Sequence, residues 1–427
     1  MRVLIATHGT RGDVQPFLAL ARGLDAAGHQ ATLAAPAAFG PLVTGYGVRF
    51  AALDDGPNRF MADPEIRAAV ENGFRGLRGK RLALRLTREV RPMLARVYQD
   101  LTAACSGAQP PDLLVHPPGL PAHHLAERLG VPAVPTGLQP WVPTRAFPCP
   151  LVPLPRLPTA LNRLSYLSLR AAVASVTGPA QRWRTQTLRL PNRRGRHDFF
   201  RRPDGRPATV LHAFSRYALP PVPDWPARVH TTGFWYLPAP ADWAPPPDLA
   251  EFLAAGPPPV YVGFGSMSGR DPARTTETVL AALAAAGVRA VLATGWGGLE
   301  AGLVGRGVYA LDQAPHDWLF PRMAAVVHHG GAGTTAAALA AGRPQVVCPF
   351  TADQPFWAWR LREVGVAVEP VPQRSLTAAG LAAAVGRAVE DPGLAGRAGE
   401  VGELVRGEDG VGAAVRVLEG EYERESG

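Results

Sequence analysis

Residues 326–335 read VVHHGGAGTT and are followed by AAAL. The apolar residues predict a buried strand, the glycines a tight turn, and the small residues after them a helix. Glycines let a ligand approach the backbone closely, and the first N–H groups of a helix attract negative charge. The stretch therefore predicts a phosphate or diphosphate site at a strand–turn–helix unit, with His329 as an additional side-chain donor. The alternative is a turn that needs glycine only for its shape.

The same alternation of strand and helix occurs in both halves of the chain. Near the N-terminus a strand at Val3–Ala6, a helix at about Gln15–Ala27 and a strand at Ala31–Ala35 form a βαβ pattern. A strand at Pro259–Phe264 and a helix at Thr275–Ala286 restart it later. This pattern predicts an α/β protein with two Rossmann-like, doubly wound parallel-sheet domains. Ligands of such sheets bind at the carboxyl ends of the strands, so we expect the domains to face a central cleft.

Nine prolines between residues 218 and 247 mark the boundary between the two halves. Proline sustains neither a helix interior nor a central strand, so this stretch is expected to be an extended interdomain linker. The predicted organisation is an N-terminal domain over 1–217, the linker over 218–247, a C-terminal domain over 248–405 and a C-terminal helix over 406–427.

The composition excludes several classes of protein. The formal net charge is +9, but Lys80 is the only lysine, and the excess of arginine, alanine, glycine and proline is typical of a GC-rich genome. We therefore expect no nucleic-acid partner. The three cysteines lack metal-ligand spacing, and no apolar run of about 18 residues is present. No signal peptide is visible, so we expect a cytoplasmic protein without a metal site or a membrane-spanning segment.

Asp353 and Gln354 follow a predicted strand at Val346–Phe350. One helix and one strand separate them from the glycine-rich turn, so both loops are expected at the same edge of the sheet. A carboxylate beside an amide suits vicinal hydroxyls, as on a hexose. An exposed Asp-Gln pair is otherwise an ordinary solvated loop.

Asp13 lies on the loop after the first strand, where a carboxylate faces the expected cleft and is able to accept a proton from an attacking hydroxyl. An ordinary Asp has a pKa of about 3.9, so burial or a nearby phosphate must raise it. The alternative is that Asp13 only caps the following helix. His116, after the strand at Leu113–Val115, is a candidate partner, and His8 is a candidate for orienting Asp13 or contacting an acceptor. A lone histidine at a strand end is otherwise an ordinary loop residue.

His329-Gly330-Gly331-Ala332-Gly333-Thr334, followed by Asp353-Gln354, resembles the donor signature of the UDP-glycosyltransferases. The sequence is most similar to the bacterial sterol and antibiotic glycosyltransferases. Residues 7–16 (THGTRGDVQP), 139–145 (QPWVPTR) and 315–321 (PHDWLFP) match motifs of the same subgroup, so the similarity runs from end to end.

This resemblance implies a GT-B fold, inversion at the anomeric carbon, and a UDP- or dTDP-hexose as co-substrate with no metal and no further cofactor. It also implies that the C-terminal helix packs back across the N-terminal domain. Asp13 takes a position at which many relatives carry a histidine, and His116 follows the strand after which they carry an acidic residue. Many relatives place a tryptophan at Gln313, which should face the nucleoside base. The implied donor-binding residues are Gly12, Ser266, Gln313, His329, Gly331, Gly333, Thr334, Asp353 and Gln354.

The acceptor side is defined by composition alone. Trp141 and Phe147 are candidates for lining an apolar acceptor pocket, or else belong to the core. The basic stretch 193–202 is a candidate for contact with lipid headgroups, or else a solvated loop. The hypothesis is transfer of a hexose to a hydroxyl of a small lipophilic acceptor, with Asp13 as base. The alternatives are a nucleotide-sugar epimerase or hydrolase, a non-catalytic accessory protein of the same fold and, from the charge alone, a nucleic-acid-binding protein.

Overall fold

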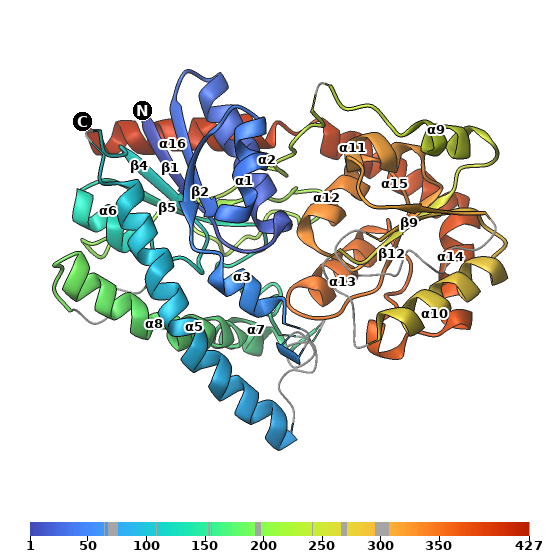
Figure 1. Cartoon of the computed structure of the whole chain (residues 1–427), viewed down its shortest axis with the longest axis horizontal. Coiled ribbons are helices and arrows are strands. Elements are labelled where there is room, and N and C mark those ends of the chain that lie inside the picture. Colours follow the sequence, from blue (N-terminus) through green and yellow to red (C-terminus); the bar gives the residue numbers. More distant parts are fainter. Residues whose placement is uncertain are drawn as a thin grey trace.

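The computed structural model describes residues 1–63, 65–66, 76–107, 109–152, 154, 156–192, 198–240, 242–265, 271–294 and 307–426. Two α/β domains lie side by side, each built on its own parallel sheet (Figure 1). None of the helices in these ranges is long and apolar enough to cross a bilayer.

The N-terminal sheet has seven strands in the order β3-β2-β1-β4-β5-β6-β7, and every neighbouring pair is parallel. Ile5 is in register with Leu33 on one side and Val115 on the other, so β1 is central. The strands are β1 Arg2–Ala6, β2 Gln30–Pro36, β3 Arg49–Leu53, β4 Leu113–His116, β5 Ala133–Gly137, β6 Val210–His212 and β7 Val229–Thr231.

The C-terminal sheet has five parallel strands in the order β10-β9-β8-β11-β12. The strand order reverses between β8 and β11, and ligands of open α/β sheets bind at such a switch point. The strands are β8 Val260–Gly263, β9 Ala290–Ala293, β10 Val308–Leu311, β11 Ala325–His328 and β12 Gln345–Val347.

Both faces of the N-terminal sheet are covered, because successive side chains of β1 point to opposite sides. Val3 and Ile5 belong to a core with α1 and α16, whereas Leu4 and Ala6 belong to a core with α5 and α6. The helices of this domain are α1 Arg11–Ala26, α2 Gly40–Gly45, α3 Gly56–Met61, α5 Gly76–Ala104, α6 His123–Leu129, α7 Thr159–Ser165 and α8 Leu167–Arg182.

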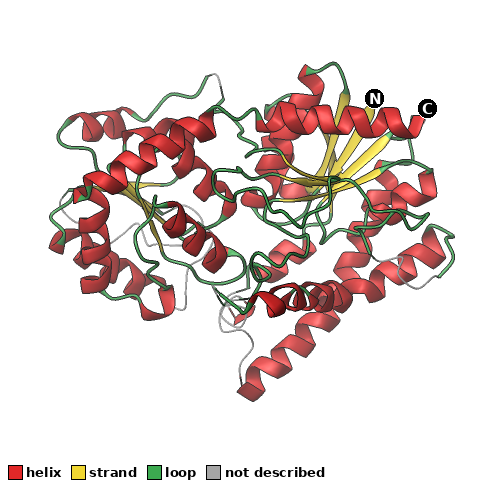
Figure 2. Cartoon of the chain, turned by 180° about the vertical axis from the view of Figure 1, so that it is seen from behind, coloured by secondary structure: helices red, strands yellow, loops and turns green. Residues whose placement is uncertain are grey.

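The C-terminal domain repeats this layered packing (Figure 2). Its helices are α9 Pro247–Ala254, α10 Pro272–Ala285, α11 His316–Leu319, α12 Ala332–Ala340, α13 Gln354–Val364, α14 Ala378–Glu390 and α15 Pro392–Arg406, after which the chain continues into α16 Gly410–Ser426.

Two local expectations are wrong. The first helix begins at Arg11 rather than near Gln15, which places Asp13 inside its first turn. The proline-rich stretch contains β7, although it was expected to sustain no sheet. This strand lies at the sheet edge and pairs only with β6, which is where a proline-rich segment is able to add a short strand.

Helix α16 lies along the N-terminal domain, so the chain returns across the interdomain boundary (Figure 1). Ala414 and Leu418 are fully buried in the core with α1, and His29 Nε2 lies 2.9 Å from Glu419 Oε1. The buried Glu421 carboxylate accepts a hydrogen bond from Thr209 Oγ1 at 2.7 Å and forms an ion pair with Arg202. Arg202, one of the basic residues considered for lipid contact, therefore holds α16. Positions 193–197 of that stretch lie outside the described residues.

Gly23 on α1 allows this docking, because a Cβ atom there would lie 2.2 Å from Val411 Cγ1. We expect Gly23→Ala to lower the free energy of unfolding by about 1–3 kcal/mol through overpacking, although alanine normally stabilises a helix. Thermal unfolding measures the change.

Gly386→Ala on α14 is the matched control, because a Cβ atom there meets nothing within 4 Å. It should leave the melting temperature unchanged or raise it. Val411→Ala should rescue Gly23→Ala. A Gly23→Ala protein as stable as the wild type would contradict the close α1–α16 packing.

Candidate active site

The N-terminal end of α1 meets the C-terminal domain directly. Arg11 Nη1 donates a hydrogen bond to Gln313 Oε1 at 2.8 Å, and Arg11 Nε donates to Gln15 Oε1 at 3.0 Å. Gln313 was expected to face a nucleoside base, and Arg11 was not singled out from the sequence. The contact brings the loop after β1 to the loop after β10, on the other side of the interdomain crevice.

Asp13 is held at this end of α1 by its own turn. Its Oδ2 atom accepts hydrogen bonds from the Thr10 N–H at 2.8 Å and from Thr10 Oγ1 at 3.1 Å. The capping alternative is therefore realised, but it occupies only one carboxylate oxygen in the described residues. Burial raises the pKa of Asp13, and the two Thr10 hydrogen bonds and the charge of His8 oppose that rise. A raised pKa makes the carboxylate a stronger base.

The loop that carries Asp13 depends on Gly9. Its φ of +137° is one that other residues rarely adopt, and a Cβ atom would lie 2.3 Å from Asp13 Oδ2. Asn58 Nδ2 donates to the Gly9 carbonyl oxygen at 2.6 Å, and His8 Nε2 donates to the Asp54 carbonyl oxygen at 3.0 Å. His8 therefore anchors the loop to the segment before α3. Neither Asn58 nor Asp54 carried a sequence signal for this role.

The glycine-rich turn opens α12, as the strand–turn–helix pattern predicted. Gly331 is the N-cap residue, so no side chain satisfies the first N–H groups of the helix. Gly330 has a φ of +90°, and a Cβ atom at Gly333 would meet nothing within 4 Å. Thr334 lies in the same first turn. Open space before uncapped amides is the arrangement that binds an anion.

His329 lies between two glycines. A Cβ atom at Gly331 would lie 2.3 Å from His329 Nε2, and one at Gly265 would lie 3.0 Å from His329 Cε1. Burial lowers the pKa of His329 to about 4, so the imidazole is neutral at pH 7 and has one N–H to donate. Its Nδ1 atom is buried without a hydrogen-bond partner among the described residues. An unpartnered nitrogen in a narrow slot is suited to a ligand oxygen.

His328 has a different role from its neighbour. Gly330 N–H donates to His328 Nδ1 at 3.1 Å, which places the imidazole proton on Nε2, 2.9 Å from Gln345 Oε1. The side chain is fully buried, and burial lowers its pKa to about 3. His328 therefore fixes the turn and is closed to ligands, a distinction that the sequence of two adjacent histidines does not make.

Asp353 and Gln354 stand at the start of α13. Gln354 Oε1 accepts hydrogen bonds from the N–H groups of Phe350 and Thr351 at 2.8 and 3.2 Å, so its acceptor oxygen serves its own loop. Asp353 Oδ2 accepts from Trp357 Nε1 at 3.1 Å. Burial raises the pKa of Asp353 to about 6, and the negative charge of Asp13 adds to the rise. The two carboxylates, one from each domain, thus act on each other across the crevice.

Two expected site residues, His116 and Trp141, are not assembled with this group. His116 is fully buried, its Nδ1 donates to the Pro117 carbonyl oxygen at 3.0 Å, and its ring stacks on His123, so no bond to Asp13 is formed. Trp141 packs in a small core with Tyr166 and against Gly137. Ser266 lies outside the described residues. Gly12 is exposed in the first turn of α1.

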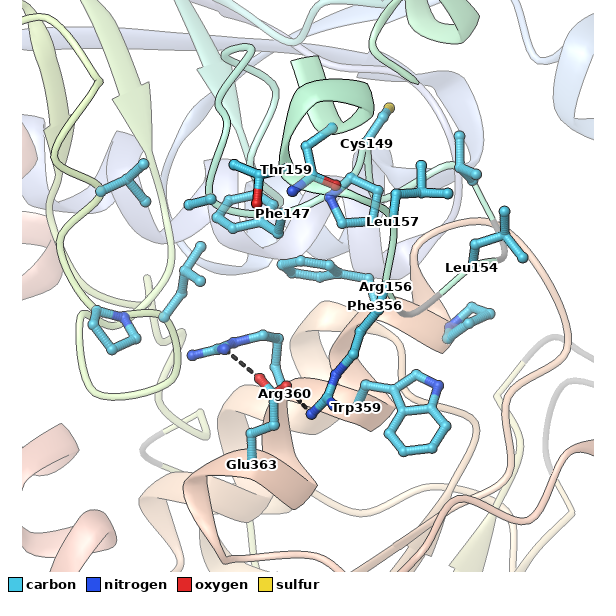
Figure 3. Close-up of a pocket in the computed structure, with 18 of the residues that line it drawn as sticks. Phe147, Cys149, Leu154, Arg156, Leu157, Thr159, Phe356, Trp359, Arg360 and Glu363 are labelled. Atoms are coloured by element: carbon cyan, nitrogen blue, oxygen red, sulfur yellow. Dashed lines mark hydrogen bonds and ion pairs between the residues drawn. The ribbon is translucent and has the colours of Figure 1, made fainter. Parts of the chain in front are cut away.

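Phe147 lines a cavity of about 430 Å³ between the two domains (Figure 3). Its ring lies 5.3 Å from that of Phe356 on α13, so both domains contribute to the wall. Neither Asp13 nor His329 is a lining residue. Most of the lining is apolar, and the charged side chains gather at one end, where Arg156 and Arg360 both pair with Glu363. In the described ranges, no three His, Cys, Asp or Glu side chains cluster in a way that could hold a metal.

Comparison with known proteins decides the family. Residues 3–148 match the glycosyltransferase family 28 N-terminal domain, and residues 279–406 match the erythromycin biosynthesis protein CIII-like C-terminal domain. The chain is 38% identical over 440 residues to O-mycaminosyltylonolide 6-deoxyallosyltransferase of Streptomyces fradiae, covering 98% of this chain and 97% of that protein. The chain belongs to this family of glycosyltransferases. The resemblance inferred from its motifs is confirmed.

The glycosyltransferase also resembles larger proteins. It is 35% identical over 435 residues to the sterol 3-beta-glucosyltransferase of Emericella nidulans, covering 98% of this chain but only 30% of that protein. Among solved structures, the calicheamicin glycosyltransferase CalG4 superposes with a TM-score of 0.68 at 20% identity, covering 99% of this chain and 98% of CalG4. Glycosyltransferase VinC in complex with dTDP gives 0.66 at 20% identity, covering 99% and 100%. The GT-B fold is confirmed.

The raised pKa of Asp353 has a consequence for stability. A carboxyl whose pKa rises on folding favours the folded state below its unfolded pKa, and this contribution is lost as pH rises through about 6. We therefore expect Asp353→Asn to raise the free energy of unfolding at pH 7.5 by up to about 3 kcal/mol, and the gain to shrink towards pH 4. Thermal unfolding at both pH values measures the difference.

Asp391→Asn serves as the control for this change, because Asp391 caps α15 in the same domain. If Asp353→Asn lowered the free energy of unfolding by the same amount at both pH values, burial would not be destabilising the ionised carboxylate of Asp353 in the folded protein.

Proposed function

We propose that this glycosyltransferase moves a hexose from a UDP- or dTDP-sugar to a hydroxyl of a small lipophilic acceptor, with inversion and with Asp13 as general base. The observation that carries the proposal is that the first turn of α1 contacts the C-terminal domain, where α1 lies against α12. Asp13 projects from the N-terminal domain, and the uncapped start of α12 with His329 projects from the C-terminal domain. The contact between Arg11 and Gln313 holds the two sides together.

The binding of the donor is proposed from the charge at the start of α12. The free amides at Gly333 and Thr334 and the positive end of the α12 dipole would bind the diphosphate, and neutral His329 would donate one more hydrogen bond. VinC, a protein of the same fold, is described in complex with dTDP. Donors aimed at the leaving group stabilise the charge that develops on it in the transition state. This arrangement assigns charge neutralisation to protein groups, so we infer a reaction that needs neither a metal nor a further cofactor.

The sugar would lie between Asp353 and Asp13. Hydroxyl groups are hydrogen-bond donors, so Asp353 would accept from the hexose. Since Gln354 Oε1 is occupied by its own loop, only its NH₂ group remains for a sugar oxygen. Gln313 would face the base, with Arg11 beside it.

The chemistry is a single displacement. Asp13 takes the proton of the acceptor hydroxyl while the acceptor oxygen forms a bond to the anomeric carbon. The bond from that carbon to the diphosphate oxygen breaks, and the electron pair leaves with the nucleoside diphosphate. Because attack and departure take place on opposite faces, one displacement inverts the configuration. The lipophilic acceptor would extend into the apolar cavity beside Phe147 and Phe356.

The first test separates the two roles of Asp13. Asn at this position keeps an oxygen for the Thr10 N–H group but cannot act as a base. We expect Asp13→Asn to lower kcat for hexosyl transfer by roughly 10²- to 10⁴-fold while the melting temperature and nucleoside diphosphate affinity stay near those of the wild type. In the wild type, the rate should fall as pH drops through the raised pKa of Asp13, since the carboxylate is the active form.

An Asp13→Asn enzyme with most of the wild-type rate would rule out this base. Product analysis without acceptor completes the test, because an epimerase or hydrolase would still turn over the nucleotide sugar and a transferase would not.

The second test addresses His329. A hydrogen bond to a charged group contributes about 1.5–3 kcal/mol, so His329→Ala should weaken UDP or dTDP binding roughly 10- to 100-fold in calorimetry. The affinity of the wild type should stay constant between pH 7 and 8, because the imidazole is neutral and the terminal phosphate is already ionised there. Asp13→Asn is the matched control, and unchanged affinity in His329→Ala would refute the phosphate contact.

A further inference from the structure

A long segment of the N-terminal domain carries positive charge only. Residues 128–197 contain eleven arginines and no Asp, Glu or Lys. Acidic residues in this chain number 35, so their absence over 70 residues is a local feature rather than a property of the composition. In its described parts this segment runs from the end of α6 through β5, α7 and α8 to the turn at Trp183–Thr187.

The same segment exposes large apolar side chains. Leu161, Leu164 and Leu167 follow one another at intervals of three along α7 and the start of α8, and they are 45%, 57% and 55% exposed. Leu154, on the loop before α7, is 49% exposed. These are four of the eight large hydrophobic residues exposed in the described part of the chain. Arg163 and Arg170 are exposed among them.

A basic groove lies farther along the same segment, at the C-terminal end of α8. It has a volume of about 410 Å³, runs between α5 and α8, and is lined by Arg88, Arg91 and Arg182 but by no acidic residue. None of the three arginines forms an ion pair within the described ranges. Gln99, Gln186 and Thr187 add polar groups to the walls. The groove therefore offers several hydrogen-bond donors to an anion, and no carboxylate in its lining repels that anion.

The helices α5, α7 and α8 lie along one edge of the molecule, away from α16 and at the side of the crevice (Figure 1). Figure 2 shows the same edge from behind. We call the surface formed by Leu161, Leu164, Leu167, Arg163 and Arg170 with the groove the α7–α8 face. Thr159 at the start of α7, with Leu154 and Arg156 on the loop before it, also lines the interdomain cavity, so that cavity adjoins α7 (Figure 3).

We propose that the α7–α8 face docks on an anionic lipid bilayer. The leucines enter the interface between headgroups and acyl chains, and the arginines bind lipid phosphates, as in amphipathic helices that lie on membranes. A lipophilic acceptor dissolved in the bilayer then reaches the cavity without crossing water.

Charge selects a bilayer over a second copy of the chain. Pairing two α7–α8 faces would bring arginines against arginines, and in the described residues only Asp198, 3.9 Å from Arg170, and Asp224, near Arg163, offset them. Leu161, Leu164 and Leu167 are exposed and line neither the interdomain cavity nor the groove, which suits insertion into a fluid interface. This inference adds an interaction surface and does not depend on the residues assigned to transfer.

The test uses sedimentation of the full chain with vesicles of phosphatidylglycerol and phosphatidylcholine, compared with vesicles of phosphatidylcholine alone. We expect binding to the anionic vesicles and little binding to the neutral ones. Binding should weaken as salt is raised from 0.05 to 0.5 M, because the Debye length falls well below about 10 Å over this range.

Two sets of variants separate the two parts of the face. Arg91→Gln with Arg182→Gln should weaken binding to anionic vesicles roughly 30-fold, because each basic residue near the surface contributes about fivefold. Leu161→Ser with Leu164→Ser and Leu167→Ser should weaken it at least tenfold and leave the salt dependence in place. Matched controls in the C-terminal domain are Leu404→Ser, which is 45% exposed on α15, and Arg374→Gln with Arg387→Gln, which are exposed. All controls should bind like the wild type.

Transfer to a water-soluble acceptor is measured on the same proteins and should be unchanged in every variant, which also shows that they fold. Equal binding to neutral and anionic vesicles, no binding at low salt, or wild-type binding by both sets of variants would each overturn the proposal. Loss of transfer by Asp13→Asn with intact vesicle binding would leave it standing, so the two proposals fail separately.

Discussion

The hydrogen bond of 2.8 Å from Arg11 on α1 to Gln313 in the C-terminal domain is the interaction on which the site depends. Each domain contributes one carboxylate, and the charge of Asp13 helps to raise the pKa of Asp353 to about 6. Burial is the main cause of that rise, and the charge of Asp13 adds the smaller part. The contact between α1 and the C-terminal domain is therefore what brings one carboxylate of each domain into the same site.

Glycines make this crevice narrow on both sides. In the N-terminal domain, the missing side chain of Gly9 leaves space for Asp13 Oδ2. In the C-terminal domain, Gly265 and Gly331 lie on either side of His329. In all three places a Cβ atom would lie 3.0 Å or less from a site atom. Because the three glycines lack a side chain, Asp13 and His329 fit closely against the backbone. A larger residue at any of the three positions would displace one of these two side chains.

The relative position of the domains rests on segments far from the site. Helix α16 returns to the N-terminal domain, where Glu421 pairs with Arg202 and Thr209, and β7 adds an edge strand from within the proline-rich stretch. The chain thus crosses between the domains twice.

The sequence by itself determined the two-domain α/β architecture, the glycine-rich turn and the family, because strand–helix periodicity and motif spacing are local properties of the chain. It also indicated Asp13, His329 and Asp353, since each lies within a few residues of a strand's carboxyl end. Only the tertiary structure decided that His328 supports the turn while His329 is open, that His116 and Trp141 pack elsewhere, and that β7 joins the sheet. These outcomes depend on which neighbours arrive from distant segments, such as Gln345, His123 and Tyr166, and on the burial that they impose on each side chain.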